Sequence, residues 1–339
     1  MFLQATDADR FRPVPAVAEH AHDIAIVAKS RERIHDELQK SVGRDVAFGS
    51  GIATLVATVT GRTAAAQESL QRDDEVLAYL PIAWVGDHVF SYAQCILVGF
   101  AVNCPESAAT VLHDLREIGP TYFFAPPRIW ENILTNVMIR LEDAAWFKRR
   151  LVHFFLDAAQ GIERRRLTGR PVTLWLRLLY ALGHPLVYEP LKDNLGMRRI
   201  RLAYTAGEAI GPDLFTFYRS IGINLKQLYG STETCAAVCL QPDGGVKFDT
   251  VGQAAPGVEI RIADSGEVLV RGANLFSGYW PDGEGGPDAD GWFSTGDVAY
   301  IDDDGDLHLV DRRRELILVS GFNVYPREVE DVLAAHPDV

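Results

Sequence analysis

The sequence contains few cysteines and no long uninterrupted apolar run. Its four cysteines, in 339 residues, form no CxxC pair, which favours reduced thiols over a disulfide framework. The N-terminus lacks the basic and apolar segments of a secretory signal. No apolar stretch reaches the about 18 residues that a membrane-spanning helix needs. We therefore expect a cytoplasmic protein with free thiols at Cys95, Cys104, Cys235 and Cys239.

Basic residues are fewer than acidic residues in this chain. There are 33 Lys and Arg against 46 Asp and Glu, a net charge of −13, which opposes binding to nucleic acids. Residues 128–201 depart from this average, because they include the basic runs 148–150 and 164–166. A solvated helix face is the ordinary explanation of such runs. Peripheral contact with anionic lipid headgroups is the alternative.

The composition is that of a globular protein. Hydrophobic residues make up 47% of the chain and charged residues 23%, so a packed core is expected. A chain of 339 residues exceeds the about 250–300 at which single cores stop growing, so more than one domain is expected.

The order of predicted elements favours an α/β fold. Strand-like runs at 74–80, 121–127 and 200–207 alternate with helical segments, which is typical of parallel βαβ units. After a further strand at 223–229, short strands are separated by Gly and Asp turns, which indicates an antiparallel β subdomain. The sequence thus predicts a parallel-sheet domain followed by a smaller β subdomain. Residues 1–62, with an amphipathic helix over 16–42, form an atypical N-terminal segment.

A dense group of polar residues follows the predicted strand that ends at Tyr229. Gly230 permits a close backbone approach, Ser231 and Thr232 offer hydroxyls, and Glu233 offers a carboxylate. Loops at the carboxyl ends of parallel strands are where open α/β sheets bind ligands. A ring, a hydroxyl and a carboxylate suit the base, phosphate and Mg²⁺ of a nucleotide. Taken alone, a plain turn explains the motif equally well.

Two more turns have related chemistry. Gly207 and Glu208 follow the predicted strand 200–207, and Asp297 ends a glycine-flanked turn. An Asp in such a turn can accept two hydrogen bonds from a vicinal diol, and an Arg such as Arg312 can support the same sugar.

The order of these motifs resembles that of the adenylate-forming superfamily, which includes acyl-CoA synthetases, luciferases and peptide-synthetase adenylation domains. The motifs are TAGEAIGPD, QLYGSTE, GEVLVRG, GWFSTGD and DRRRELILVSGFNVYPREVE. The resemblance covers about residues 63–339, and the long-chain fatty-acyl-CoA synthetases of bacteria are most similar. It implies a partial adenylation domain over 63–311 and the start of an α+β C-terminal lid over 312–339.

The resemblance also implies residue roles. Tyr229 would stack on adenine, Asp297 would hold the ribose hydroxyls and Arg312 would assist. Thr232 would contact phosphate and Glu233 would help to bind Mg²⁺, and we treat these two as the catalytic residues.

The other implied residues contact the nucleotide or CoA. Gly207 and Glu208 would line the adenine side, and Gly230 and Ser231 belong to the same nucleotide loop. Gly321 would enter the pantetheine tunnel when the lid rotates. The implied reaction is AMP-forming ligation of a long-chain fatty acid to CoA, with ATP and Mg²⁺.

Two departures from the family pattern weaken this expectation. The phosphate-binding loop normally has further glycines and a lysine, and only Gly49–Gly51 hints at it. The lid lysine that promotes adenylate formation normally lies beyond the position of Val339. An alternative is therefore a catalytically weak or inactive relative that binds adenylate or fatty acid.

Other features have ordinary interpretations. The acidic run 302–306 is better explained by a hairpin turn than by a calcium loop. Five aromatic side chains are expected in the core rather than along an acyl tunnel. They are Trp130, Trp146, Phe147, Phe154 and Phe155.

Overall fold

The computed structural model describes residues 61–81, 84–208, 210–279, 284–312, 317–319 and 322–324. The expected helix over 16–42 and the glycines of 49–51 lie outside these residues, and so does Gly321.

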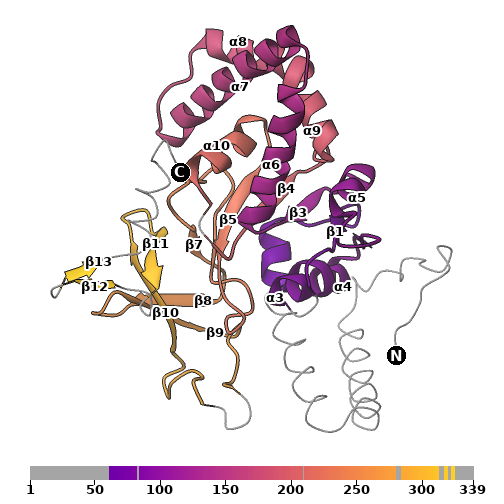
Figure 1. The fold of residues 1–339 in the computed structure, drawn as a ribbon. Coiled ribbons are helices and arrows are strands. Elements are labelled where there is room, and N and C mark those ends of the chain that lie inside the picture. The colour runs from indigo at the N-terminus through magenta and orange to yellow at the C-terminus, as the bar shows by residue number, and fades with distance from the viewer. Residues whose placement is uncertain are drawn as a thin grey trace.

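A seven-stranded sheet forms the centre of the molecule (Figure 1), in the order β2-β1-β3-β4-β5-β6-β7. Strands β1 to β5 are parallel, and β6 and β7 continue the sheet in antiparallel fashion. The predicted parallel βαβ region is confirmed. The strands are β1 (Glu75–Leu77), β2 (Ala101–Asn103), β3 (Tyr122–Phe124), β4 (Leu202–Thr205), β5 (Leu225–Tyr229), β6 (Cys239–Leu240) and β7 (Gln253–Ala254).

Helices connect the parallel strands. Between β1 and β2 lies a continuous helical run with a π-helical centre, and four α-helices lie between β3 and β4. Prolines occupy the first positions of α6 and α10, where no backbone N–H is needed. The helices are α3 (Val85–Asp87), η1 (His88–Ala93), α4 (Gln94–Val98), α5 (Val111–Ile118), α6 (Pro127–Glu142), α7 (Trp146–Leu167), α8 (Leu174–Gly183), η2 (His184–Tyr188), α9 (Glu189–Leu195) and α10 (Pro212–Ser220).

A glycine ends α9 where this helix meets α5. Gly196 has a φ of 72°, and a Cβ there would lie 2.2 Å from the Leu115 carbonyl oxygen. Only glycine fits both the left-handed conformation and this close approach.

A second, antiparallel sheet has the order β11-β10-β9-β8, as the sequence predicts for the β subdomain. Its strands are β8 (Val258–Ile262), β9 (Glu267–Gly272), β10 (Phe293–Ile301) and β11 (Leu307–Arg312). A two-stranded unit follows, with β12 (Ile317–Val319) and β13 (Phe322–Val324).

The acidic run between β10 and β11 is a hairpin turn, as predicted. The Gly305 N–H donates to the Asp302 carbonyl at 3.0 Å. The Lys247 ammonium lies 2.8 Å from Asp304 and 2.7 Å from Asp306, so a cation of the chain itself offsets part of the negative charge of this cluster.

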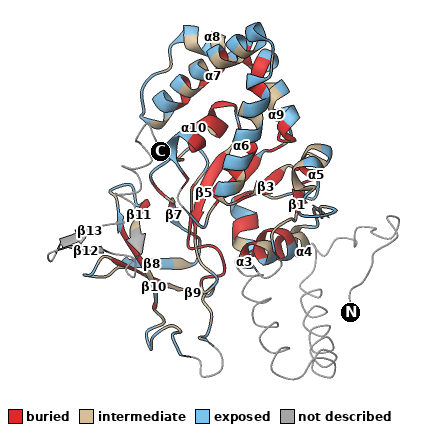
Figure 2. Cartoon of the chain, in the orientation of Figure 1, coloured by how far each residue is buried: buried red, intermediate tan, exposed pale blue. Residues whose placement is uncertain are grey.

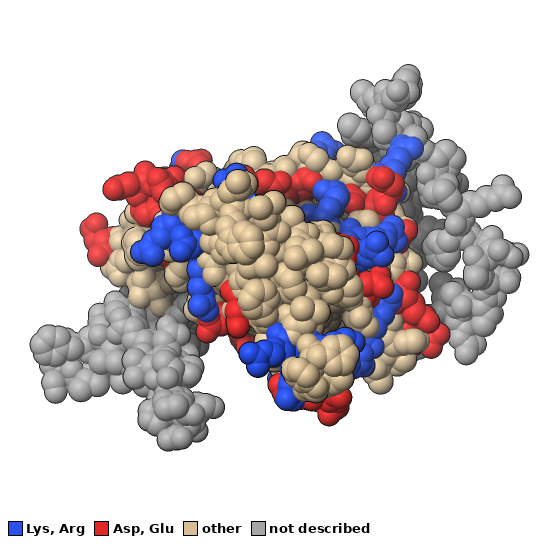
Figure 3. Space-filling model, turned by 90° about the horizontal axis from the view of Figure 1, so that it is seen from above, with Lys and Arg blue, Asp and Glu red and all other residues tan. Residues whose placement is uncertain are grey.

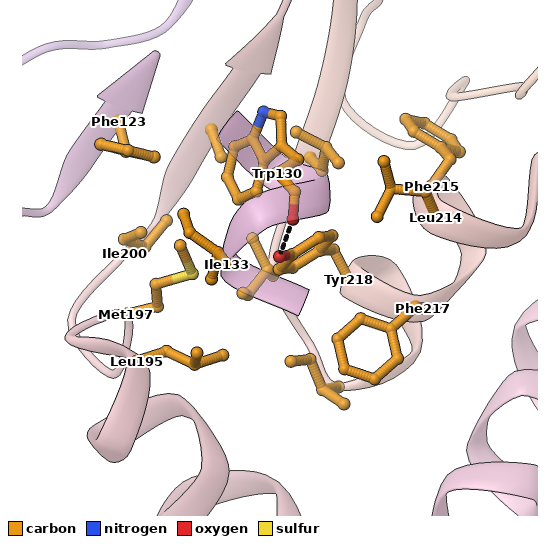
Figure 4. Packing of buried hydrophobic residues seen from close by; sticks show 14 of the residues in the cluster. Phe123, Trp130, Ile133, Leu195, Met197, Ile200, Leu214, Phe215, Phe217 and Tyr218 are labelled. Atoms are coloured by element: carbon orange, nitrogen blue, oxygen red, sulfur yellow. Dashed lines mark hydrogen bonds between the residues drawn. The ribbon is translucent and has the colours of Figure 1, made fainter. Parts of the chain in front are cut away.

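The largest core cluster lies between the main sheet and α6 and α10 (Figures 2 and 4). Trp130 is fully buried, and its indole N–H donates to the Ala125 carbonyl at 3.0 Å. The Tyr218 hydroxyl donates to the Trp130 carbonyl at 2.7 Å, and Phe123 packs edge-on against the indole. These bonds satisfy the polar atoms of two large aromatic side chains inside the core.

The expectation that all five singled-out aromatics are core residues is wrong for three of them. Trp130 and Phe155 are buried, but Trp146, Phe147 and Phe154 are 71%, 63% and 56% exposed. Helix α7 packs against α8 and α10, and its buried residues begin at Phe155. The sequence of α7 does not show this, since apolar residues occur on more than one side of the helix.

A buried polar network ties the residues before β1 to the main sheet. The Lys226 ammonium on β5 lies 2.7 Å from Glu68, and their side chains are only 1% and 3% exposed. The Tyr204 hydroxyl on β4 donates to the other oxygen of Glu68. Asp243 lies 2.7 Å from the same ammonium, so the buried lysine has two carboxylate partners.

We predict that Lys226→Met lowers the free energy of unfolding by about 3–5 kcal/mol, because Glu68 is then buried without its cation. The matched control is Arg164→Met, which removes an exposed pair with Asp213 and should cost less than about 1 kcal/mol. Urea denaturation measures both. Equal losses for the two variants would contradict the role given to Lys226.

A second prediction concerns Asp74 and pH. Burial opposes ionisation of this carboxyl, but hydrogen bonds from Arg201, the Gln71 N–H and Thr121 outweigh it and hold the pKa below its ordinary value of 3.8. A lowered pKa in the folded state stabilises the fold above the unfolded pKa and ceases to do so as pH falls through the folded value. Asp74→Asn should therefore cost most stability above about pH 5 and progressively less below it.

Urea denaturation between pH 3 and pH 7 measures this difference, with the exposed Asp264→Asn as the control that should show no such trend. A loss for Asp74→Asn that stays constant over the whole range would contradict the prediction.

Candidate nucleotide site

The loop after β5 is a tight hydrogen-bonded turn. The Ser231 N–H donates to the Thr234 hydroxyl at 2.8 Å, and the Ala236 N–H donates to the Ser231 carbonyl at 2.9 Å. Cys235 and Ala236 have φ values of 52° and 72°, which is uncommon for residues with a Cβ. Strained backbone of this kind is often found at functional sites.

Gly230 makes this loop possible. A Cβ at this position would lie 2.3 Å from the Ala236 carbonyl oxygen, so the returning backbone occupies the space of a side chain. The close approach expected from the sequence is therefore made to the chain itself.

A hydrogen bond joins the two sheets at the candidate site. The Tyr229 hydroxyl at the end of β5 donates to Asp297 Oδ2 on β10 at 2.5 Å. The two residues are 7% and 9% exposed. Burial, together with the negative charge of Asp297, raises the pKa of Tyr229 well above its ordinary value. The phenol therefore stays protonated and donates a hydrogen bond to the carboxylate.

The backbone around Asp297 is also fixed. Glu267 on β9 accepts hydrogen bonds from the Gly296 N–H, at 3.2 Å, and from the Ser294 hydroxyl. The Thr295 hydroxyl donates to the Val268 carbonyl at 3.0 Å. Glu267 and Val268 thus fix the backbone of residues 294–296, which directly precede Asp297.

Asp297 and Arg312 occupy paired positions on β10 and β11. The antiparallel register thus brings together the two residues that the sequence assigns to one sugar. The side chain of Arg312 lies outside the described part of the structure.

Four other predicted residues lie in the loops at the carboxyl ends of β4 and β5. Because β4 and β5 are adjacent and parallel, Gly207 and Glu208 after β4 and Thr232 and Glu233 after β5 follow neighbouring strand ends. Gly207, Glu208 and Thr232 are exposed. Glu233 is half-buried, and its Oε1 accepts a hydrogen bond from the Tyr279 hydroxyl at 2.8 Å.

Several residues that support the site were given no role from the sequence. Tyr279 and Glu267 lie in the GYW and GEVLVRG motifs, but nothing in the spacing shows which side chains they contact. Asn274 is buried and donates to the carbonyls of Thr234 and Ala237, at 2.9 Å and 3.1 Å. A single asparagine in the sequence does not indicate that its side chain will bond to the backbone of this loop.

We predict that Gly230→Ala displaces the loop and lowers the free energy of unfolding by about 1–3 kcal/mol, because the added methyl group meets backbone atoms. Gly211→Ala is the matched control, since no atom lies within 4 Å of a Cβ at that position. Thermal denaturation of both variants tests this. A Gly230→Ala protein as stable as Gly211→Ala would contradict the close approach.

The family of AMP-binding enzymes matches residues 50–280 of the chain. The long-chain-fatty-acid–CoA ligase FadD15 of Mycobacterium bovis is 34% identical over 291 residues, which are 84% of this chain and 47% of that protein. Long chain acyl-CoA synthetase 4 of Arabidopsis thaliana is 28% identical, over 83% of this chain and 44% of its own length. The chain thus spans about half the length of these relatives.

Solved structures show the same fold. The o-succinylbenzoate CoA synthetase of Bacillus subtilis, in complex with its acyl-adenylate intermediate, superposes with a TM-score of 0.59 at 22% identity. The alignment covers 84% of this chain and 50% of that one. With the family match over residues 50–280, the sheet order and the loops at the ends of β4 and β5, these likenesses show that the chain belongs to the AMP-binding enzyme family.

Proposed function

We propose that this chain acts in AMP-forming ligation of a long-chain fatty acid to coenzyme A. The observation that carries the proposal is the Tyr229–Asp297 hydrogen bond, because it joins the loop after β5 to the strand that carries the candidate ribose ligand. Relatives named long-chain-fatty-acid–CoA ligases support the substrate class.

The proposed reaction has two steps. A fatty-acid carboxylate oxygen forms a bond to the α-phosphorus of ATP while the bond to pyrophosphate breaks. The sulfur of CoA then bonds to the acyl carbon, its proton is lost, and the bond from this carbon to the AMP oxygen breaks. The products are acyl-CoA, AMP and pyrophosphate.

The nucleoside would be held by residues from both sheets. Asp297 would accept hydrogen bonds from the ribose hydroxyls, with its orientation set by the Tyr229 hydroxyl, and Arg312 would assist from the paired position on β11. Gly207 and Glu208 would line the adenine side. Tyr229 is 7% exposed, so only a small part of its ring is available to the base, and stacking stays a prediction.

The phosphate side would be formed by the loop after β5. The exposed Thr232 hydroxyl would contact phosphate, and the Ser231 hydroxyl lies in the same turn. The half-buried carboxylate of Glu233 is an oxygen ligand of the type that Mg²⁺ prefers. Bound Mg²⁺ would neutralise phosphate charge. The Tyr279 hydroxyl would orient the carboxylate.

The domain boundaries and the cellular location belong to the same proposal. Residues 63–311 would form part of an adenylation domain, and residues 312–339 would begin a C-terminal lid in which Gly321 contacts the pantetheine of CoA. A cytoplasmic location fits a substrate set of ATP, CoA and fatty acid.

We predict that Asp297→Ala weakens AMP binding by about 5- to 150-fold, which corresponds to loss of about 1–3 kcal/mol of hydrogen bonding to a charged group. Asp264→Ala, at an exposed position in another turn, is the matched control and should leave Kd unchanged. Isothermal titration calorimetry measures both constants.

Palmitate-dependent release of pyrophosphate tests the reaction separately. AMP binding that depends on Asp297 without any pyrophosphate release would favour the alternative of a binding relative. AMP binding that Asp297→Ala leaves unchanged would contradict the site itself.

A further inference from the structure

Helices α7 and α8 present large apolar side chains to solvent. We call this surface the α7–α8 face. Trp175 and Trp146 are 72% and 71% exposed, and the other members are each more than two-fifths exposed. The members are Trp146, Phe147, Leu151, Phe154, Leu174, Trp175, Leu178 and Leu182, together with Leu186 on η2, which directly follows α8.

The spacing of these residues makes a continuous surface. Leu174, Leu178 and Leu182 are four residues apart on α8, so they lie on one side of that helix. Phe147, Leu151 and Phe154 are spaced by four and then three residues, so they also share one side of α7. The two helices contact each other, so both rows belong to one part of the molecule.

The apolar residues by which α7 joins the core are not those of the α7–α8 face. Phe155, Leu156, Ala159 and Ile162 are buried, and they follow Phe154 along the helix. The part of α7 up to Phe154 therefore leaves large apolar side chains in solvent, whereas the part after it packs such side chains into the core. Exposed apolar surfaces of this extent usually mark a binding site.

Basic residues are in excess in the segment that forms the α7–α8 face. Between Trp146 and Leu186 the sequence has eight Lys or Arg against two acidic residues, in a chain of net charge −13. Figure 3, seen from the end at which α7 and α8 lie in Figure 1, shows a broad area of uncharged side chains with Lys and Arg along its border, among some acidic ones.

Several of these cations are available to an external anion. In the part of the chain that the structure describes, no carboxylate lies within ion-pair distance of five of them. All five are exposed: Lys148, Arg150, Arg165, Arg170 and Arg177.

We propose that the α7–α8 face docks on an anionic lipid surface. Trp, Phe and Leu beside Lys and Arg are the composition of helices that lie in a membrane interface. The aromatic and leucine side chains would enter the headgroup region, and the cations would bind lipid phosphates. No helix among the described residues is long and apolar enough to cross a bilayer, so the contact is one of docking at the surface.

A second copy of the chain is the less favoured occupant. In a symmetric dimer through this face, each basic border would meet an identical basic border, and like charges at an interface are repulsive. A lipid surface of opposite charge has no such conflict. The proposal rests on the surface alone and does not depend on the proposed reaction.

Co-sedimentation with vesicles tests the proposal. The probes are vesicles of phosphatidylcholine alone and of phosphatidylcholine with about one-third phosphatidylglycerol. We expect binding to the anionic vesicles, at least about tenfold weaker binding to the neutral ones, and weaker binding in high salt, because screening acts on the lysine and arginine contacts.

Variants locate the contact. Phe147→Ser/Trp175→Ser should reduce binding to anionic vesicles at least about tenfold, since two large interfacial side chains are lost. Phe248→Ser is the matched control, because Phe248 is also an exposed phenylalanine but lies in the β6–β7 connection. Arg165→Gln/Arg170→Gln should reduce the preference for anionic vesicles, since two of the five cations are lost. Circular dichroism of each variant verifies folding.

Three results would overturn the proposal. One is failure of the folded chain to bind anionic vesicles. Another is binding that the Phe147→Ser/Trp175→Ser variant retains in full. The third is a dimer, seen by light scattering, that this variant abolishes while vesicle binding is unchanged, which would assign the face to a second copy.

Discussion

The arrangement of the main sheet depends on the buried contacts of the Glu68 carboxylate with Tyr204 and Lys226. This carboxylate lies between the Tyr204 hydroxyl on β4 and the Lys226 ammonium on β5, more than a hundred residues away in the sequence. A buried charge without its partner is costly, so the pairing of these groups favours this arrangement of the strands. The same two strands carry, at their carboxyl ends, the loops of the candidate site. The network thus fixes the strands from which the nucleotide loops extend.

The Tyr229–Asp297 hydrogen bond extends this order to the second sheet. The raised pKa of Tyr229 keeps the hydroxyl a donor at any physiological pH, so the contact is not weakened by deprotonation. Glu267 and Val268 on β9 hold the backbone beside Asp297. The candidate site is therefore built from two sheets whose relative position is set by buried hydrogen bonds.

The exposed α7–α8 face shows where pattern reasoning was insufficient. Trp130, Phe155 and Trp146 are all large aromatics on helices, yet only the first two are buried. Periodicity shows which residues share a helix side, but it cannot show which side has a neighbour. Helix α7 has apolar residues around much of its circumference, and its packing on α10 and α8 decides which of them meet solvent.

The sequence by itself determined the parallel strands, the change to antiparallel structure after Tyr229, the hairpin at 302–306 and the family, because each depends on local periodicity, turn residues or motif order. It also gave the candidate nucleotide residues as predictions. Only the tertiary structure decided that Tyr229 bonds to Asp297, that Tyr279 contacts Glu233, and that Lys247 pairs with the acidic turn. These contacts join side chains 46 to 68 residues apart, and no local pattern specifies such pairs.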